Sequence, residues 1–185
     1  MPKISTYGTV TPSPSDLIVV SDANDSNATK NITVGSLTAT ASPSNFINAY
    51  NDGSTSTTIT LTGGSTWDNV TAPLTLETGD GLIVDSSDNY KITNNTSGTL
   101  TCSIQGTVTV TGPTNAGLMI AFNVGGSTVF SAESDITLSN ASRPSEASII
   151  SIKNIAAGES VYFQFKGTAQ DDIVISHLSL VVISI

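Results

Sequence analysis

Apolar and polar positions alternate with a period of two along most of the chain from about residue 57 onward. In the clearest run, residues 99–111, Thr, Ser and Gln fill one parity and apolar side chains fill the other. Successive side chains of a strand point to opposite faces, so the run predicts a strand with one face in a core and one in solvent. Its core-facing positions are Leu100, Cys102, Ile104, Val108 and Val110.

Similar runs recur between clusters of Gly, Asn and Asp, which favour turns. Gly125-Gly126 is expected to connect two such strands, and in residues 161–166 the three residues Val161, Phe163 and Phe165 are predicted to face inward. Tyr162, Gln164 and Lys166 would then face outward. Short strands at this spacing predict an all-β fold, a sandwich or barrel. The other predicted strands include Ile59 and Leu61, 82–84, 90–92, 118–124, 128–130 and 149–152.

The last run, Ile173 to Ile185, has apolar residues on both parities. A strand of a two-sheet sandwich has only one core face, so something else must cover the second. The economical cover is another copy of the same chain around a symmetry axis; the alternative is the arm or a loop of the same chain. The residues predicted to form this self-association surface are Ile175, His177, Val181, Ile183 and Ile185.

The chain divides into three parts: an N-terminal arm over residues 1–40, a connector over 41–55 and a β-sandwich over 56–185. Thr11-Pro-Ser-Pro-Ser15 leads into the arm and is unable to pair as a central strand. In the connector, Ser44 to Tyr50 is expected to form a helical turn capped by Ser44 and ended by Asn51-Asp52-Gly53.

Residues 16–37 of the arm read as a short apolar strand, a polar loop and a second strand. These residues follow the sequence pattern D-L-I-x-V-S-D-x-x-x-x-N-A-T-K-N-x-T-V-x-x-L. The pattern resembles the N-terminal segment of many structural proteins of tailed bacteriophages, where it precedes a β-rich domain. The resemblance implies that this extended or hairpin arm docks on other virion proteins by adding strands to their sheets. The expected docking residues are Leu17, Val19, Ile32, Val34 and Leu37.

The C-terminal two thirds resemble the trimeric jelly rolls of the tumour necrosis factor-like class, which are common as head domains on phage fibres and decoration proteins. The shared features are the long alternating strand, the hairpin Asn123-Val-Gly-Gly126, the turn from Ile155 to Val161 and a strand that ends at the last residue. The resemblance implies a homotrimer whose final strand lies close to the three-fold axis.

Charge and composition exclude several partners. The net charge of −9 and the scattered Lys and Arg residues argue against nucleic acid, since phosphate binding needs clustered cations. We see no apolar run near 20 residues and no leader, so we expect neither a membrane partner nor an export signal. The single cysteine, Cys102, is predicted to be a buried, inert thiol.

The sequence offers little chemistry. His177 is the only histidine and lies among apolar residues, so we expect a packed or interface imidazole; three copies around an axis would make assembly pH-sensitive. Asp22–Asn27 begins like a calcium loop but lacks the required Gly and Glu. Asp80, Asp85 and Asp88 are a further candidate for a cation at a rim, with solvated carboxylates as the default. We therefore predict no cofactor, no metal and no catalytic residue.

Two functional classes remain for a non-enzymatic chain. The first is a capsid decoration or cement protein on the virion surface, which binds the major capsid protein or another virion protein and trimerises through its C-terminal domain. The second is a short tail-fibre or spike component that binds a host receptor. Its candidate loops are Gly63–Asp68, Gly112–Gly117 and Ser139–Glu146, although none shows the paired aromatics typical of a sugar site.

Overall fold

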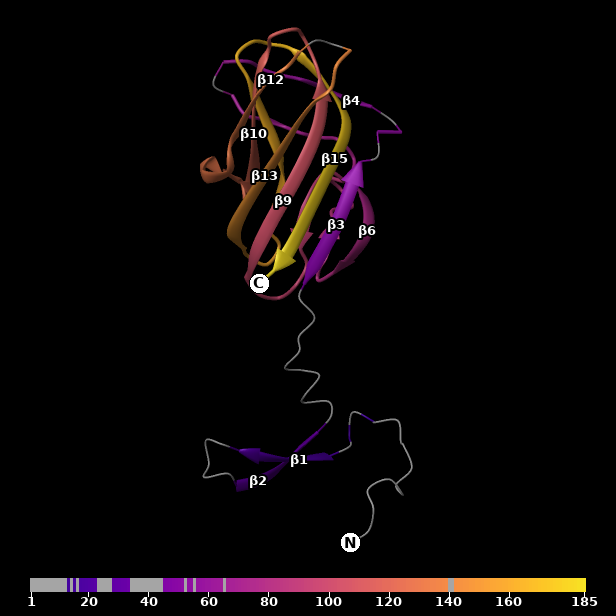
Figure 1. Ribbon diagram of the computed structural model, residues 1–185, viewed down its shortest axis with the longest axis vertical. Coiled ribbons are helices and arrows are strands. Elements are labelled where there is room, and N and C mark those ends of the chain that lie inside the picture. Colours follow the sequence, from indigo (N-terminus) through magenta and orange to yellow (C-terminus); the bar gives the residue numbers. More distant parts are fainter. Residues whose placement is uncertain are drawn as a thin grey trace. The chain divides into compact units, whose positions relative to one another are not determined.

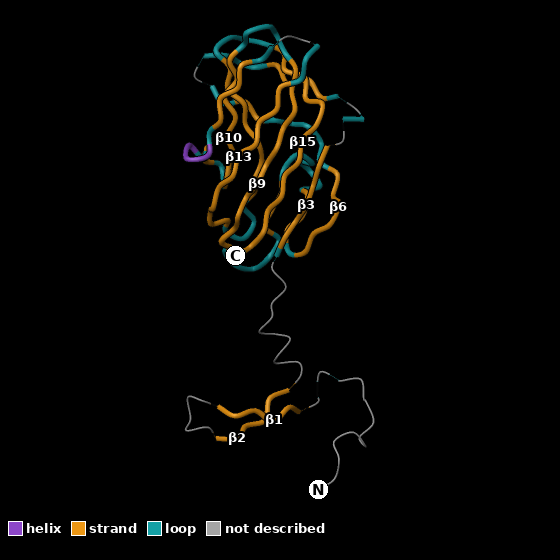
Figure 2. The backbone as a smooth tube through the Cα atoms, in the orientation of Figure 1, coloured by secondary structure: helices purple, strands orange, loops and turns teal. Residues whose placement is uncertain are grey.

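The structure is a computed structural model that divides the chain into two compact units, Met1–Pro43 and Ser44–Ile185. Each unit is described by itself. Figure 2 shows strands in both units, and in the second unit also loops and a short helix, Phe130–Ala132. None of the described residues belongs to a helix that is long and apolar enough to cross a membrane. The described residues are 13, 15, 17–22, 28–33, 45–51, 53–54, 56–64, 66–139 and 142–185.

The first unit contains an antiparallel hairpin of β1 (Leu17–Asp22) and β2 (Ala28–Thr33). Its register pairs Leu17 with Thr33 at one end and Asp22 with Ala28 at the other. The turn-forming residues between the strands lie outside the described part of the chain. Of the two forms expected for the arm, extended or hairpin, the described residues form a hairpin.

The second unit is a sandwich of two antiparallel sheets (Figure 1). In the first, here called the β9 sheet, the strands follow the order β13-β9-β15-β3-β6, with β4 also paired to β15. The bounds of these strands are β3 Phe46–Asn51, β4 Thr57–Thr60, β6 Thr75–Asp80, β9 Leu100–Thr111, β13 Ser145–Ile155 and β15 Asp172–Ser184.

The second sheet, here called the β10 sheet, has the order β11-β10-β14-β8-β7, with β12 paired to β10 and β5 paired to β14. A short 3-10 helix, η2 (Phe130–Ala132), follows β11. The bounds of these strands are β5 Asp68–Asn69, β7 Leu82–Val84, β8 Ile92–Asn94, β10 Gly117–Val124, β11 Ser127–Thr128, β12 Ser134–Thr137 and β14 Ser160–Gly167.

The core lies between the sheets and is made of the predicted alternating positions. Cys102, Ile104, Val108 and Val110 of β9 are fully buried, and Leu100 packs at the edge of the same cluster. Phe122 of β10 and Phe163 of β14 meet across the β10 sheet with ring centroids 5.1 Å apart. Alternation therefore identified the core because each sheet has one covered face.

Gly106 of β9 lies against two phenylalanine rings of the β10 sheet. A Cβ atom built on Gly106 would lie 2.2 Å from Cζ of Phe163 and 2.8 Å from Cε1 of Phe122. Carbon atoms pack no closer than about 3.5 Å, so only glycine fits at this point of β9. The two phenylalanine rings thus fill the space that a side chain at 106 would occupy.

Three local predictions are wrong. The strand predicted over 90–92 is instead β8, Ile92–Asn94, and Tyr90 and Lys91 precede it. The helical turn predicted for 44–50 is instead strand β3, whose Ile47 and Ala49 are fully buried and whose backbone pairs with β15. Burial of two apolar positions at strand spacing outweighs the capping signal of one serine. The strand predicted over 128–130 ends at Thr128, and Phe130 begins helix η2.

A β-bulge in β15 explains why its sequence is apolar on both parities. The pairing with β9 shifts register between Ile175 and His177, so one extra residue is accommodated there. Before the bulge Ile173 and Ile175 face the core; after it Leu178 and its alternate neighbours do. The apolar residues on both parities of 173–185 are therefore explained in part by the bulge, because after it the opposite parity faces the same core.

Candidate interaction surface

The outer face of the β9 sheet carries side chains of β13, β9 and β15 in register. Pairing places Ile152 beside Ser103 and Ser103 beside Ile183 in one row, and Ile150, Gln105 and Val181 in the next. A third row contains Ser148, Thr107 and Ser179. We call these nine residues the β9 face.

Large apolar side chains are exposed on the β9 face and beside it. Ile150 is 62% exposed, Ile152 is 63% exposed and Ile183 is 36% exposed, while Ile185 at the end of the chain is 72% exposed. A single exposed isoleucine is ordinary, but adjacent rows of them form a patch of the kind that marks an interaction site.

The β9 face carries no ionisable side chain, in a protein whose net charge is −9. Ionisable side chains lie next to it, at Glu146 and His177 in the following row and at Asp80, which is reached from Ile183 through Phe46. Depletion of charge at the centre is the compositional signature of protein interfaces. Two of the polar groups that remain pair with each other: the hydroxyl oxygens of Thr107 and Ser148 are 3.0 Å apart.

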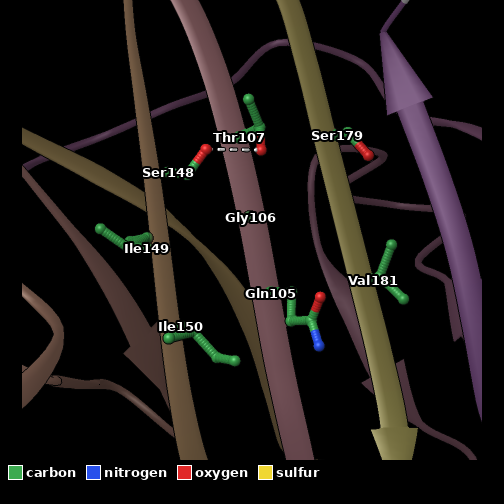
Figure 3. Close-up of a pocket in the computed structure, with 8 residues that line it drawn as sticks. All are labelled: Gln105, Gly106, Thr107, Ser148, Ile149, Ile150, Ser179 and Val181. Carbon is green, nitrogen blue, oxygen red and sulfur yellow. Dashed lines mark hydrogen bonds between the residues drawn. The ribbon is translucent and has the colours of Figure 1, made fainter.

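A depression of about 320 Å³ lies on the β9 face, over Gly106. Figure 3 shows its lining: Ile150 extends from β13 towards β9, Val181 lies on β15, and the Thr107–Ser148 hydrogen bond closes one side. Since Ser148 and Ser179 are small, the sheet surface is hollow where flanking isoleucines stand out. A depression of this shape can receive an apolar side chain that projects from a partner.

The predicted self-association residues fall in two places. Val181 and Ile183 lie on the β9 face, while His177 and Ile185 are exposed near its two ends. Ile175, in contrast, is fully buried in the core of its own sandwich because it precedes the bulge, so it is removed from the surface set. Ile150 and Ile152 of β13, which pairs with β9, were not predicted to lie at this surface. Their alternation with Ile149 was the available signal.

Of the predicted docking residues, Leu17 and Val19 belong to β1 and Ile32 belongs to β2. Val34 and Leu37 lie outside the described residues. In the hairpin, Ile32 is paired with Ile18, and Val19 with Asn31.

The acidic rim has a structural use. Oδ1 of Asp85 accepts hydrogen bonds from the backbone N–H groups of Ser87 (2.8 Å) and Asp88 (3.0 Å), and these bonds hold the pKa of Asp85 below its ordinary value. Asp88 pairs with Lys91 at 2.7 Å. Within the described residues, no three His, Cys, Asp or Glu side chains gather as a metal site.

Cys102 is fully buried, as predicted, and desolvation raises the pKa of its thiol. A raised pKa keeps the thiol protonated at neutral pH and therefore poorly nucleophilic.

Comparison with known proteins shows the fold. No family model and no curated protein match the sequence. The structure of Eiger TNF from S. frugiperda is similar with a TM-score of 0.54 at 8% identity, covering 76% of this chain and 93% of that one. Murine APRIL gives 0.47 at 9% identity (77% and 99% covered), and the PRD1 vertex protein P5 gives 0.47 at 12% (76% and 96% covered). The predicted class, an all-β jelly-roll sandwich similar to tumour necrosis factor, is confirmed.

Proposed function

We propose that this chain is a non-enzymatic structural protein of a tailed-phage virion: a homotrimeric decoration protein that docks on the capsid surface through its N-terminal arm. The observation that supports the trimer is the β9 face, which has no ionisable side chain and exposes isoleucine side chains. The observation that supports a virion role is the phage-like sequence pattern of residues 16–37, within which β1 and β2 pair as a hairpin in a unit separate from the jelly roll.

The β9 face suits association of three identical copies. It lies on the sheet that contains β15, the strand expected near the three-fold axis in tumour necrosis factor-like trimers. Beside it, β13 is an edge strand that pairs only with β9 among the described residues, so its outer edge is open. A face and an adjacent edge are the two surfaces that a closed ring of three subunits brings together.

The hairpin suits docking on a second protein. A two-stranded hairpin is marginally stable alone in water. Within the described residues, β1 and β2 pair only with each other, so each strand offers one open backbone edge. Addition of these edges to a capsid sheet would form main-chain hydrogen bonds and order the arm on binding. The major capsid protein is the partner that we propose.

The trimer is tested by placing a charge on the β9 face. Ile183→Glu should convert the trimer to a monomer in sedimentation equilibrium at micromolar concentration, because three buried carboxylates near one axis repel each other. Ile83→Glu is the matched control, since Ile83 is 41% exposed, close to the 36% of Ile183, but lies on the β10 sheet. A trimeric Ile183→Glu protein would remove the β9 face from the interface.

The virion role is tested by quantitative mass spectrometry of purified particles, with the copy number expressed per major capsid subunit. Hundreds of copies per particle are expected for a decoration protein. A few tens or fewer would indicate a fibre or spike instead. Absence from the particle would overturn the proposal.

A further inference from the structure

The outer face of the β10 sheet holds an aromatic pair that the sequence does not reveal. Trp67 and Phe130 come from distant segments, and their ring centroids are 6.5 Å apart at an interplanar angle of 62°. Phe130 is 68% exposed, although Val129 and Ala132 beside it are buried. Helix η2 is thus anchored by its neighbours while its aromatic residue is held in solvent, in contact with Trp67.

Polar groups surround this pair. Nζ of Lys166 lies 4.7 Å from the centroid of the Trp67 ring, a cation–π contact, and no carboxylate of the described residues forms an ion pair with it. Lys166 also lines a depression of about 250 Å³, together with Asp135, Thr137 and Thr168. Lys166 therefore joins the aromatic pair to a hollow whose lining also includes one carboxylate and two hydroxyl-bearing residues, with Met119 between Lys166 and Asp135 in the strand pairing.

An amide network stiffens the strands beneath the pair. Gln164 is only 6% exposed; its Nε2 donates to Asn69 Oδ1 at 2.9 Å, and its Oε1 accepts from Thr128 at 2.9 Å. Asn123 Nδ2 donates to the same Oε1 at 3.3 Å, whereas the buried Oδ1 of Asn123 has no partner among the described residues. These hydrogen bonds connect side chains of β5, β14, β10 and β11, the strands next to Trp67 and Phe130.

We propose that this surface, defined by Trp67, Phe130, Lys166 and Asp135, binds a saccharide. The C–H face of a pyranose ring is apolar and stacks on an exposed aromatic ring, while its hydroxyl groups both donate and accept hydrogen bonds. The hollow offers an acceptor in Asp135 and a donor in Lys166 for those hydroxyls. Its volume, below the roughly 300–1,000 Å³ of drug-sized sites, fits one sugar unit of a longer chain.

Other occupants fit this surface less well. Nucleic acid requires clustered cations, whereas Lys166 is the one Lys or Arg among the residues that line this hollow, which also include Asp135. A second copy of the chain is expected to bind the β9 face, on the opposite sheet, because that face has no ionisable side chain. The combination of an aromatic pair with mixed-charge polar groups matches a polyhydroxylated ligand, and this goes beyond the proposed structural role.

Trp67 is the only tryptophan in the chain, so its emission reports directly on the site. We would titrate the full-length protein with the methyl glycosides of glucose, galactose, mannose, N-acetylglucosamine and glucuronic acid, and with dextran as a polymer. A saturable change in Trp67 emission is expected for at least one of them, with a Kd of about 1 mM for a single sugar unit. The affinity is then confirmed by calorimetry.

Two variants locate the binding. Phe130→Ala removes an exposed ring and leaves the buried anchors of η2 intact, and it should weaken binding about tenfold or more. Lys166→Met should do the same while keeping the apolar stem beside Trp67. Ile83→Ala, an exposed residue of the same sheet, should bind like the unaltered protein.

Absence of any saturable response across this panel would overturn the proposal, as would Phe130→Ala binding with unchanged affinity. The test is independent of the proposed function. A monomeric Ile183→Glu protein should keep the sugar affinity, since that residue lies on the other sheet.

Discussion

Gly106 sets the spacing of the two sheets at their centre. Replacement by Ala would place a methyl group within 2.2 Å of Phe163 and 2.8 Å of Phe122, so the rings or the strand must move. We expect Gly106→Ala to lower the free energy of unfolding by about 1–3 kcal/mol, the usual cost of overpacking. Urea unfolding followed by circular dichroism measures this change.

The matched control for that substitution is Gly98→Ala, because a Cβ atom at Gly98 meets nothing within 4 Å. Its stability should stay within about 0.5 kcal/mol of the unaltered protein. Combining Gly106→Ala with Phe163→Leu should recover part of the loss, since the smaller side chain makes room. If Gly106→Ala unfolds at the same urea concentration as the unaltered protein, the rings are not in contact with this strand.

Asp85 gives one source of acid sensitivity with a defined sign. Its carboxylate accepts two backbone N–H bonds in the loop before β8, and these lower its pKa from the ordinary 3.8. A lowered native pKa stabilises the fold above the unfolded value, and this contribution is lost as the pH falls through the native value. Asp85→Asn should therefore melt at a lower temperature than the unaltered protein at pH 7, with the difference shrinking below pH 3.8. A constant difference across this range would show that the charge is not involved.

The strands show what alternation can and cannot predict. The core faces of β9 and β14 follow from sequence because each strand is long and has one polar parity, and that of β10 follows from the large apolar residues at alternate positions. Two features of the strands could not be predicted from alternation. The bulge in β15 changes parity without any Gly or Pro to mark it, and Gln164, expected outward, is buried by neighbours from other parts of the chain.

The bulge itself is testable by deletion. Paired positions of β15 and β9 keep one register up to Ile175 and another from His177, so removing Ser176 lets a single register continue. We expect the Ser176 deletion to fold, with its core faces unchanged. Deleting Ser179 instead flips every following side chain to the opposite face and should destabilise the protein by several kcal/mol more, read by thermal unfolding. Equal effects of the two deletions would contradict the assigned register.

The interaction surfaces belong to the scale of the whole molecule, and this is where sequence reasoning is weakest. Val181 and Ile183 were visible as a second apolar parity, but Ile150 and Ile152 join them only through pairing of β13 with β9. Trp67 and Phe130 likewise meet only in the folded chain. Local patterns predict which face of a strand is apolar; they do not predict which strands become neighbours.

The two-unit organisation predicts that the jelly roll is stable without the arm. The second unit begins at Ser44, and its first described contact is the backbone oxygen of Asn45, which accepts from Ser184 N at 2.7 Å. A protein lacking residues 1–43 should therefore keep its melting temperature and its oligomeric state. The docking role proposed above adds that it should lose binding to capsids stripped of the native chain. Cosedimentation with such capsids measures the last property.

The matched truncation removes residues 1–51 and with them β3. That change exposes the β15 edge and deletes Ile47 and Ala49, both fully buried, so a large loss of stability is expected. If both truncations bind capsids as well as the full chain does, docking belongs to the jelly roll rather than to the arm. If removal of residues 1–43 already unfolds the sandwich, the two units are not independent, because the arm then contributes to the same cooperative structure.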